Sequence, residues 1–390
     1  MSLRGIRVLD VTHQIAGPWS TELLADLGAD VIKVENPNGG DPARKYPYFG
    51  PAVFVTENRN KKSITLNLKS QKGRAIALEL VSRCDIFVEN FTPGLMEKLR
   101  LGYSDLREIN PRLIYCSISG FGKVSPNRDR PAWDAALQAM SGLMTITGEP
   151  ERPPMRVGTS IVDLTAGTYA VCGILLALLE REKSGLGRLV DISLFDSAAS
   201  LVNYWGAHAS ITHTVPTRMG NTWPALAPYQ VFQTKDGFVF IGASNDDFWK
   251  KLCEVLELNS LIVDSRFSTN ERRVKNMAIL AQLVDETTRK WENEKLIAEL
   301  HRVEVPCAPV NTVDKMINDE SLAHRGFLVT TSYEGLGEFK VTSNPLRSAN
   351  LADKDSNAPA PSLGQHTDVV LKELGYSESD ISNLRNEGVV

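Results

Sequence analysis

The sequence predicts an α/β protein: a large domain with a doubly wound, mostly parallel, Rossmann-like sheet, and a smaller α+β domain. Three observations lead to this fold class. The first third of the chain alternates short β-branched runs with helical patterns, the texture changes after residue 200, and 390 residues exceed what one hydrophobic core usually supports. With 42% hydrophobic and 23% charged residues, the composition is that of folded domains and not of a disordered chain.

The strands expected in the large sheet are short runs rich in Val, Ile and Leu. They cover residues 6–11, 31–35, 63–68, 86–90, 113–118 and 189–194. Helical patterns at residues 18–27, 72–83 and 160–182 lie between them, which predicts helices on both faces of a parallel sheet. The helix at 160–182 is rich in Ala, Gly, Leu and Val, so we expect it to be buried nearly all round.

A different pattern begins in the second half of the chain. Residues 233–241 predict a hairpin that turns at Asp236-Gly237, and amphipathic helices are expected at 246–256, 276–291 and 295–303. An Ala/Pro linker at 357–361 precedes a helix at 367–374. We therefore expect a large domain over residues 1–200, with residues 345–390 packing back on it, and a small domain over 225–330. Residues 201–224 and 331–344 are the expected linkers.

Charge and cysteine usage exclude several classes of partner. A net charge of -4 and a pI of about 6.0 give no field that would hold nucleic acid. The five cysteines form no C-x-x-C pair and the six histidines show no metal-ligand spacing, so no metal site is expected. No run of 18 apolar residues and no leader is present, so we expect no membrane contact and a cytoplasmic protein. A mature organellar form would carry the same sequence.

The loop after the first expected strand runs from Thr12 to Pro18 and leads into a helix. Ligands of open parallel sheets gather at the carboxyl ends of strands, where helix N-termini favour anions. Only Gly17 of a G-x-G-x-x-G pattern is present, which argues against a dinucleotide-dependent dehydrogenase. The alternative is a tight turn with Pro18 at the first helical position.

Polar and basic residues follow other expected strands. Asn67 and Lys69 close the third strand, and Phe91 follows the fourth, where its ring could stack on a base. Lys69, Arg100 and Arg130 are candidates to meet phosphates. Taken singly, each of these basic residues is better explained as a solvated surface charge, and their value as candidates lies in the strand-end location that they share.

Asp163 lies early in the long apolar helix. There the positive end of the helix dipole favours a carboxylate, which would keep it ionised and available as a nucleophile. Gly158 before it, and Ala166 and Gly167 after it, are expected to leave room for a bulky acyl group. The alternative is that Asp163 is an ordinary helix-capping residue.

Seven segments, in order along the whole chain, resemble the class III CoA-transferases, which share their fold with α-methylacyl-CoA racemase. They are VLDVTHQIAGPWSTELLADLGADVIKVE, NRNKKSITLNLK, DIFVENFTPG, INPRLIYCSISGFG, PAWDAALQAMSG, VGTSIVDLTAG and PSLGQHT. Within the family, the strings NRNKKSI, APYQ with F-x-TKDG, and the ending GVV resemble the succinyl-CoA:glutarate CoA-transferases.

The resemblance implies an interlocked homodimer, with CoA on the large domain and the small domain of the partner covering the site. It implies that Asp163 is the covalent nucleophile and that no cofactor is bound permanently, since coenzyme A or acyl-CoA enters as a substrate. The implied CoA contacts are Ile15, Ala16, Leu66, Asn67, Lys69, Asn90, Phe91, Thr92, Arg100, Arg130, Trp133 and Asp134. Asn36 departs from the family, because many members carry an arginine there. Residues 218–228 lack the glycine-rich covering loop of the oxalate-specific members.

The function implied is transfer of CoA from an acyl-CoA such as succinyl-CoA to a carboxylic, and specifically a dicarboxylic, acid. A racemase is one alternative, but its catalytic histidine would fall at Trp133, whose indole nitrogen cannot act as a base. A non-catalytic CoA-binding protein is another. Arg218 and Asn221 could pair with the distal carboxylate of the acid or could belong to the loop surface.

Overall fold

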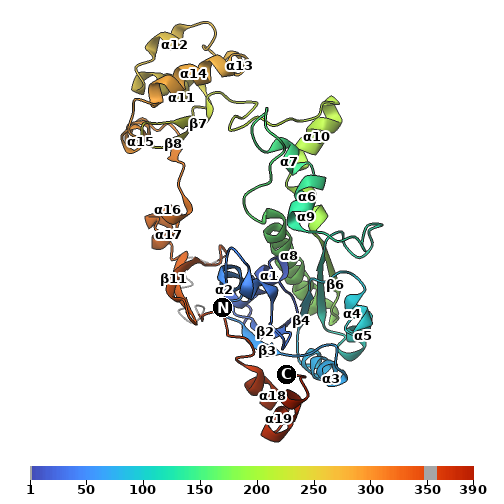
Figure 1. Cartoon of the computed structure of the whole chain (residues 1–390). Coiled ribbons are helices and arrows are strands. Elements are labelled where there is room, and N and C mark those ends of the chain that lie inside the picture. The colour runs from blue at the N-terminus through green and yellow to red at the C-terminus, as the bar shows by residue number, and fades with distance from the viewer. Residues whose placement is uncertain (1, 347–357) are drawn as a thin grey trace. The chain divides into compact units, whose positions relative to one another are not determined.

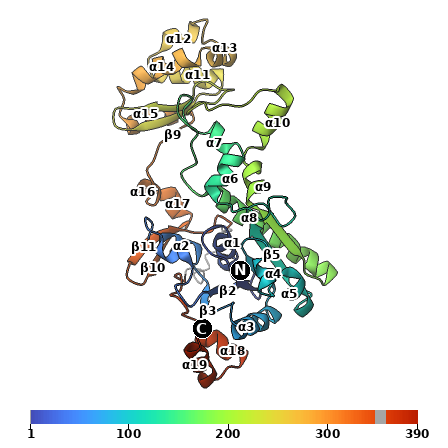
Figure 2. The ribbon, with the colours of Figure 1, turned by 45° about the vertical axis from the view of Figure 1, so that its right-hand side comes forward.

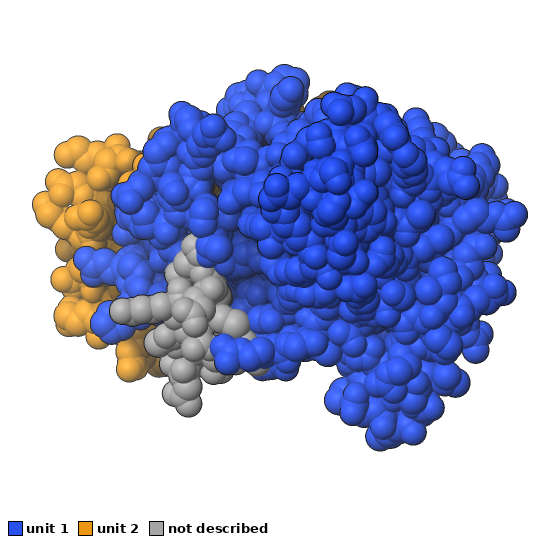
Figure 3. Space-filling view, turned by 90° about the horizontal axis from the view of Figure 1, so that it is seen from below, with its two compact units in different colours: residues 1–143, 156–207, 317–390 blue, residues 144–155, 208–316 orange. Residues whose placement is uncertain are grey.

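The computed structural model describes residues 2–346 and 358–390, which form two compact units (Figure 3). The first unit comprises residues 1–143, 156–207 and 317–390, and the second comprises residues 144–155 and 208–316. These boundaries differ from the expected ones. Residues 317–330 belong to the first unit and residues 144–155 to the second, so the chain enters the second unit twice.

Six strands build the sheet of the first unit. They are β1 (Arg7–Asp10), β2 (Asp30–Glu35), β3 (Lys62–Thr65), β4 (Ile86–Glu89), β5 (Ile114–Ser119) and β6 (Leu189–Ser193). All neighbours pair in parallel, in the order β3-β2-β1-β4-β5-β6. This is the strand order of doubly wound nucleotide-binding sheets, in which β1, β2 and β3 extend the sheet to one side and β4, β5 and β6 extend it to the other. Each strand overlaps an expected run, which confirms the predicted parallel sheet.

Helices connect these strands and follow them to the end of the chain. They are α1 (Ala16–Asp26), the 3₁₀ helix η1 (Pro42–Lys45), α2 (Ala52–Glu57), α3 (Gln71–Ser82), α4 (Leu95–Lys98), α5 (Tyr103–Ile109), α6 (Asp134–Met140), α8 (Ile161–Ser184), α9 (Leu194–Ser200), α17 (Glu320–His324), α18 (Thr367–Leu374) and α19 (Glu378–Asn386). Two more helices, α7 (Leu143–Ile146) and α10 (Asn203–Thr212), lie where the chain passes between units. Helix α1 begins at Ala16, so Pro18 is its third residue and not its first.

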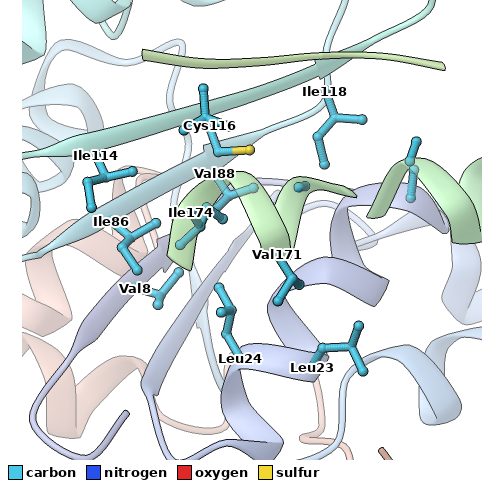
Figure 4. Close-up of a cluster of buried hydrophobic side chains, with 14 of the residues drawn as sticks. Val8, Leu23, Leu24, Ile86, Val88, Ile114, Cys116, Ile118, Val171 and Ile174 are labelled. Atoms are coloured by element: carbon cyan, nitrogen blue, oxygen red, sulfur yellow. The ribbon is translucent and has the colours of Figure 1, made fainter. Parts of the chain in front are cut away.

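Two apolar clusters cover the two faces of the sheet. Successive strand residues point to opposite faces, so Val8 belongs to one cluster and Leu9 to the other. The first cluster packs α1 and α8 on the sheet through side chains such as Leu24 and Ile174 (Figure 4). The second packs α3 and α18 on the opposite face and includes Val370. The sheet is therefore covered on both faces, as the alternating pattern predicted.

Helix α8 is exposed along one side, so the expectation that it is buried nearly all round is wrong. Ala166 and Ile174 lie in the first core cluster, whereas Tyr169, Leu176 and Leu179 are 45%, 60% and 65% exposed. By length and composition alone α8 could cross a membrane, but the core helix of a soluble protein meets the same criterion. No described part of the single chain covers the exposed apolar side.

The carboxyl-terminal segment covers the edge strand β3. The backbone N–H of His366 donates to the carbonyl of Ser63 at 2.8 Å, and that of Thr65 donates to the Thr367 hydroxyl at 3.0 Å. Helix α18 lies beside β3, and α19 lies beside α18, in both ribbon views (Figures 1 and 2). The Ser63 carbonyl and the Thr65 N–H, which lie on the outer edge of β3, thus have hydrogen-bond partners within the chain. Part of the expected linker at 357–361 lies outside the described residues.

The expected linker at 331–344 is instead largely a hairpin. Strands β10 (Leu328–Tyr333) and β11 (Gly337–Thr342) pair antiparallel in the first unit. Gly335 and Gly337 at the turn have φ of +79° and +70°, a region that favours glycine. Two glycines beside alternating apolar and polar residues were a hairpin pattern that the predicted boundaries missed.

The second unit combines a small antiparallel sheet with helices, as predicted. Its strands are β7 (Tyr229–Gln233), β8 (Phe238–Gly242) and β9 (Cys307–Pro309), in that order. Its helices are α11 (Asp246–Val255), α12 (Asn259–Val263), α13 (Asn270–Lys275), α14 (Met277–Thr288), α15 (Asn293–Arg302) and α16 (Val313–Met316). The β7–β8 hairpin turns at the predicted Asp236-Gly237, and Phe232 and Trp249 lie in a separate core.

Candidate active site

Two cavities open at the carboxyl ends of the parallel strands, within the first unit. One, of about 310 Å³, contains Asp163 and is lined by the loops after β1, β4 and β5; we call it the Asp163 cavity. The other, of about 340 Å³, is lined by the loops after β1, β2, β3 and β4; we call it the Lys69 cavity. His13, Phe91 and Leu95 line both, so the two cavities adjoin. This is the edge where open α/β sheets bind ligands.

Most residues implied by the family resemblance line one of these cavities. In the Asp163 cavity they are Ile15, Ala16, Asn90, Phe91, Thr92, Trp133 and Asp134. In the Lys69 cavity they are Leu66, Asn67, Lys69 and Phe91. Asn36, which stands where many family members carry an arginine, also lines the Lys69 cavity. The fold therefore gathers segments from different strand ends into one continuous region.

Arg100 and Arg130 are not among the described residues that line these two cavities. The Arg100 side chain is 82% exposed, and its guanidinium lies 3.7 Å from the Asp105 carboxylate. The Arg130 guanidinium lies 5.9 Å from the ring centroid of Phe121. In the single chain both arginines are surface charges, which is the alternative considered for them above.

Asp134 caps the helix that carries Asp163. Asp163 is the third residue of α8, and the residue before the helix, Ser160, makes no side-chain capping bond. The Asp134 carboxylate instead accepts hydrogen bonds from the backbone N–H of Val162 at 2.7 Å and of Asp163 at 3.3 Å. Its other oxygen accepts from the Gln138 amide at 2.6 Å. Because Asp134 satisfies the helix terminus, the carboxylate of Asp163 is not used for capping.

The carboxyl group of Asp163 is weakly acidic. Burial, and after it the charge of Asp134, raises the pKa of Asp163 to about 7. Among the described residues, none donates a hydrogen bond to its side-chain oxygens. The expectation that the helix dipole keeps this carboxylate readily ionised is therefore wrong, because desolvation and a like charge outweigh the dipole.

Helices α1 and α8 both begin at the carboxyl edge of the sheet and pack closely. A Cβ atom at Gly167 would lie 2.6 Å from the Ala16 carbonyl oxygen and 2.8 Å from a ring carbon of Trp19. Gly167 thus permits the helix contact, and Ala166 is buried in the core, so the expectation that they leave room for an acyl group is wrong. Residues four apart share a helix face, so Asp163 faces the residues just before α1.

A buried charge network fixes the loop after β1. Lys61 lies 3.1 Å from the Asp10 carboxylate and Lys33 lies 3.0 Å from Asp41, with all four side chains at most 1% exposed. Asp10 accepts from the Thr12 N–H at 2.8 Å, and Lys33 donates to the Thr12 carbonyl at 2.8 Å. Burial alone would raise the pKa of Asp10, but Lys61 and Lys33 hold that pKa below its usual range.

Asn90 joins the loops after β1 and β4. Its side-chain oxygen accepts from the His13 N–H at 3.0 Å, and its amide nitrogen donates to the His13 carbonyl at 2.8 Å. The His13 and Phe91 rings lie 4.7 Å apart, and burial lowers the pKa of His13. His13 and Gln14 were missed as site residues, although their position directly after β1 pointed to this edge.

The described residues contain no group of three or more His, Cys, Asp or Glu side chains placed to hold a metal ion. The Asp163 cavity contains a carboxyl group of raised pKa. Such a group can act as a nucleophile toward an acyl carbon or as a base.

Solved structures define the class of protein. The chain is similar to a CaiB/BaiF family protein from Brucella suis, with a TM-score of 0.84 and 34% identity over 95% of this chain and 98% of that chain. It is also similar to Rv3272 from M. tuberculosis, with a TM-score of 0.82 and 30% identity over 94% and 98% of the two chains. The fold is thus that of the CaiB/BaiF family protein.

Sequence comparisons define the family. The profile "CoA-transferase family III" matches residues 3–367. The chain is 37% identical to succinyl-CoA:glutarate CoA-transferase from Homo sapiens, over 100% of this chain and 90% of that protein. It is 36% identical to succinate–glutarate CoA-transferase from Agrobacterium fabrum, over 95% of each. The chain belongs to CoA-transferase family III and is an enzyme.

Proposed function

We propose that this enzyme transfers coenzyme A from succinyl-CoA to a dicarboxylic acid through a covalent aspartyl-CoA thioester on Asp163. The observation that carries the proposal is the position of the Asp163 carboxylate. It lies at the start of α8 in a cavity that adjoins a second, largely apolar cavity at the same sheet edge. A thioester in the first cavity would leave the second for the rest of the CoA molecule.

The transfer runs through four acyl exchanges. An oxygen of Asp163 attacks the thioester carbon, the carbon–sulfur bond breaks, and a mixed anhydride and CoA thiolate result. The thiolate attacks the Asp163 carbonyl carbon, which releases succinate and leaves aspartyl-CoA. The acceptor carboxylate attacks that thioester, giving a second anhydride and CoA thiolate. The thiolate then attacks the acceptor acyl carbon, which forms the new acyl-CoA and frees Asp163.

The Lys69 cavity is proposed to hold the nucleotide end of CoA. Leu66 and Phe91 offer apolar surface for the base, and Lys69 is an exposed cation beside them for the phosphates. Asn36 supplies a polar but uncharged contact at the same cavity. Ile15, Ala16 and the segment from Asn90 to Thr92 would then contact the thiol end in the Asp163 cavity.

The choice of acids is supported by what related proteins are named for. The relatives include enzymes named for succinyl-CoA with glutarate, with D-citramalate and with mesaconate, at 36–37% identity. Another, from Acetobacter aceti, is named for acetyl-CoA and oxalate. Three of these four names pair succinyl-CoA with a second dicarboxylic acid, so we propose that combination here.

Two alternatives are less well supported. By family resemblance the catalytic histidine of a racemase would stand at the position of Trp133, whose indole has no basic nitrogen. A non-catalytic CoA-binding protein would give no reason for a carboxylate of raised pKa in the cavity. The homodimer and the cytoplasmic location stay predictions; the exposed apolar side of α8 supports the first.

The test is Asp163→Asn, assayed with succinyl-CoA and a panel of dicarboxylic acids. Asn keeps the size but has no anionic oxygen, so we expect turnover to fall by a factor of about 1,000 or more while CoA binding stays unchanged. In the wild type, succinyl-CoA followed by hydroxylamine should leave a hydroxamate on the peptide that contains Asp163.

Asp196→Asn is the matched control, because Asp196 is also the third residue of its helix, α9, and is exposed. It should keep full activity. An Asp163→Asn variant that retains more than about a tenth of wild-type turnover, a loss of less than about 1.4 kcal/mol, would contradict the covalent mechanism.

A further inference from the structure

Gln14 lines the Asp163 cavity with an uncommon backbone conformation. Its φ is +69°, in the left-handed region that residues other than glycine rarely adopt. It lies between β1 and α1, at the carboxyl edge of the sheet. Backbone strain of this kind persists only where the surroundings hold the residue in place, and it is concentrated at functional sites.

Two side chains hold Gln14. The buried Asp41 carboxylate accepts a hydrogen bond from the Gln14 backbone N–H at 3.0 Å, and Lys33 fixes Asp41 in turn. The Tyr46 hydroxyl donates to the Gln14 side-chain oxygen at 2.8 Å. The backbone and the side-chain amide are therefore both positioned. Among the described residues, none accepts a hydrogen bond from the Gln14 amide nitrogen.

Two other polar side chains of the cavity, Asn90 and Asp134, are already engaged in hydrogen bonds. The Asn90 amide uses both ends on the backbone of His13. The Asp134 carboxylate can only accept, and it is occupied by the N-terminus of α8 and by Gln138. Of the two amide side chains that line the cavity, Gln14 is the one that keeps its two N–H donors for a ligand.

Gln14 and Asp163 lie on neighbouring elements that face each other. Gly167 packs against Ala16, and Asp163 is one helical turn before Gly167, so its side chain is directed toward the residues that precede α1. Burial raises the pKa of Tyr46, and the charges of Asp41 and Asp163 raise it further. The Tyr46 hydroxyl, which donates to Gln14, is therefore close enough to Asp163 to interact electrostatically with its carboxylate.

We propose that Gln14 is a catalytic residue whose side-chain amide donates a hydrogen bond to the acyl oxygen of the thioester that Asp163 attacks. The inference rests on the proposed function. As the bond from Asp163 to the acyl carbon forms, the carbonyl π electrons move onto this oxygen, which becomes negative until the carbon–sulfur bond breaks. A fixed neutral donor stabilises that oxyanion more than the uncharged thioester. Tyr46 and Asp41 are positioning residues.

The experiment is a double-variant cycle on Gln14 and Tyr46. Gln14→Leu removes the donor at similar size and should lower kcat by about 100-fold or more, with KM for succinyl-CoA nearly unchanged. Tyr46→Phe removes only the hydroxyl that holds the amide and should lower kcat less. The double variant should be no slower than Gln14→Leu alone, because both changes act on one hydrogen bond.

Tyr48→Phe is the matched control for Tyr46→Phe, since Tyr48 lies two residues after Tyr46 and is 89% exposed. It should leave kcat unchanged. Thermal unfolding is measured for each variant. Should Gln14→Leu fail to fold, Gln14→Asn tolerates the left-handed conformation and shortens the donor by one methylene, so the same loss is expected.

Three outcomes overturn the proposal. The first is a folded Gln14 variant whose kcat is within about twofold of wild type, and the second is a loss of kcat/KM that comes entirely from a higher KM. The third is that Gln14→Leu and Tyr46→Phe lower kcat independently of each other. Asp163→Asn is assayed beside them and decides the proposed function separately. An inactive Asp163→Asn variant with a fully active Gln14→Leu variant removes the role of Gln14 alone. An active Asp163→Asn variant removes the covalent mechanism.

Discussion

The carboxyl groups of Asp163 and Asp134 have different roles although they lie in one cavity. Asp134 is held by three hydrogen bonds, whereas the described residues leave the oxygens of Asp163 without a donor. Burial and then the charge of Asp134 raise the pKa of Asp163 to about 7. The charge of Asp163 in turn adds to burial in raising the pKa of Tyr46 and of Glu57. A carboxylate of higher basicity is a stronger nucleophile, provided that it is ionised.

We expect kcat/KM for succinyl-CoA to rise about tenfold per pH unit below pH 7 and to level off above it, because only ionised Asp163 attacks. Asp134→Asn removes a like charge and keeps an acceptor for the helix terminus, so the rise should move to lower pH. Kinetics from pH 5 to 9 measure this. Asp129→Asn, at a side chain that is 75% exposed, is the control. A profile that stays in place, or moves upward, would show that Asp134 does not set the pKa.

The same shift predicts how stability depends on pH. The folded-state pKa of Asp163, about 7, exceeds its unfolded value of about 3.9. Protonated Asp163 therefore contributes to the free energy of unfolding. This contribution is fully present below the unfolded-state pKa and is lost as the pH rises through the folded-state pKa. Replacing Asp163 with Asn removes this loss, so the Tm of the variant relative to wild type should increase between pH 5 and pH 8. A capping role would instead lower the Tm at every pH.

At the residue scale, the sequence located the site through strand ends and through family resemblance. Asp163, Asn90 and Lys69 follow from those two arguments. Two contacts could not be predicted in this way: the hydrogen bond from the Val162 N–H to the Asp134 carboxylate, and the hydrogen bond from the Tyr46 hydroxyl to Gln14. Each joins segments whose proximity depends on how helices and loops pack. Periodicity along a chain carries no information on such contacts.

At the element scale, β-branched runs located all six strands of the large sheet, since buried parallel strands are apolar on both faces. The burial of α8 was overestimated, because an apolar composition does not reveal which side of a helix packs on the sheet. The β10–β11 hairpin was missed for a different reason. Its six-residue strands are partly exposed, so they lack the continuous apolar run that marked the buried strands of the large sheet.

Two adjacent lysines at the start of β3, Lys61 and Lys62, allow an element-scale prediction. Lys61→Met should lower the free energy of unfolding by about 3–5 kcal/mol, because it leaves the Asp10 carboxylate buried and without its main partner. Lys62→Met is the adjacent control. Lys62 pairs with Asp30 at 2.8 Å, but both side chains are about a third exposed, so the loss should be below about 1 kcal/mol. Urea unfolding measures both, and equal losses would contradict the role given to the network.

At the scale of the whole molecule, the exposed side of α8 bears on assembly. Tyr169, Cys172, Leu176 and Leu179 recur at helical spacing along one face. A second copy of the chain is the occupant that the family resemblance implies for such a surface. We therefore expect the protein to sediment as a dimer even at nanomolar concentration.

Leu176→Lys combined with Leu179→Lys should lower the Tm, because the dimer interface would bury unpaired charges. Val124→Lys, at a side chain that is 95% exposed, is the control and should have little effect. Analytical ultracentrifugation and thermal unfolding are the measurements. A stable folded wild-type monomer, or an α8 variant as stable as the control, would exclude this interface.

The closure of strand β3 by the carboxyl-terminal segment has a consequence for synthesis of the protein. Thr65 and Thr367, which are hydrogen-bonded to each other, are 302 residues apart in the chain. A ribosome that adds about 5–20 residues per second needs about 15–60 seconds to make the chain between them. Throughout that time the sheet has an open edge beside β3, ready to pair with other nascent chains. The edge is therefore open to pairing during synthesis, and it is covered only after the carboxyl-terminal segment has been made.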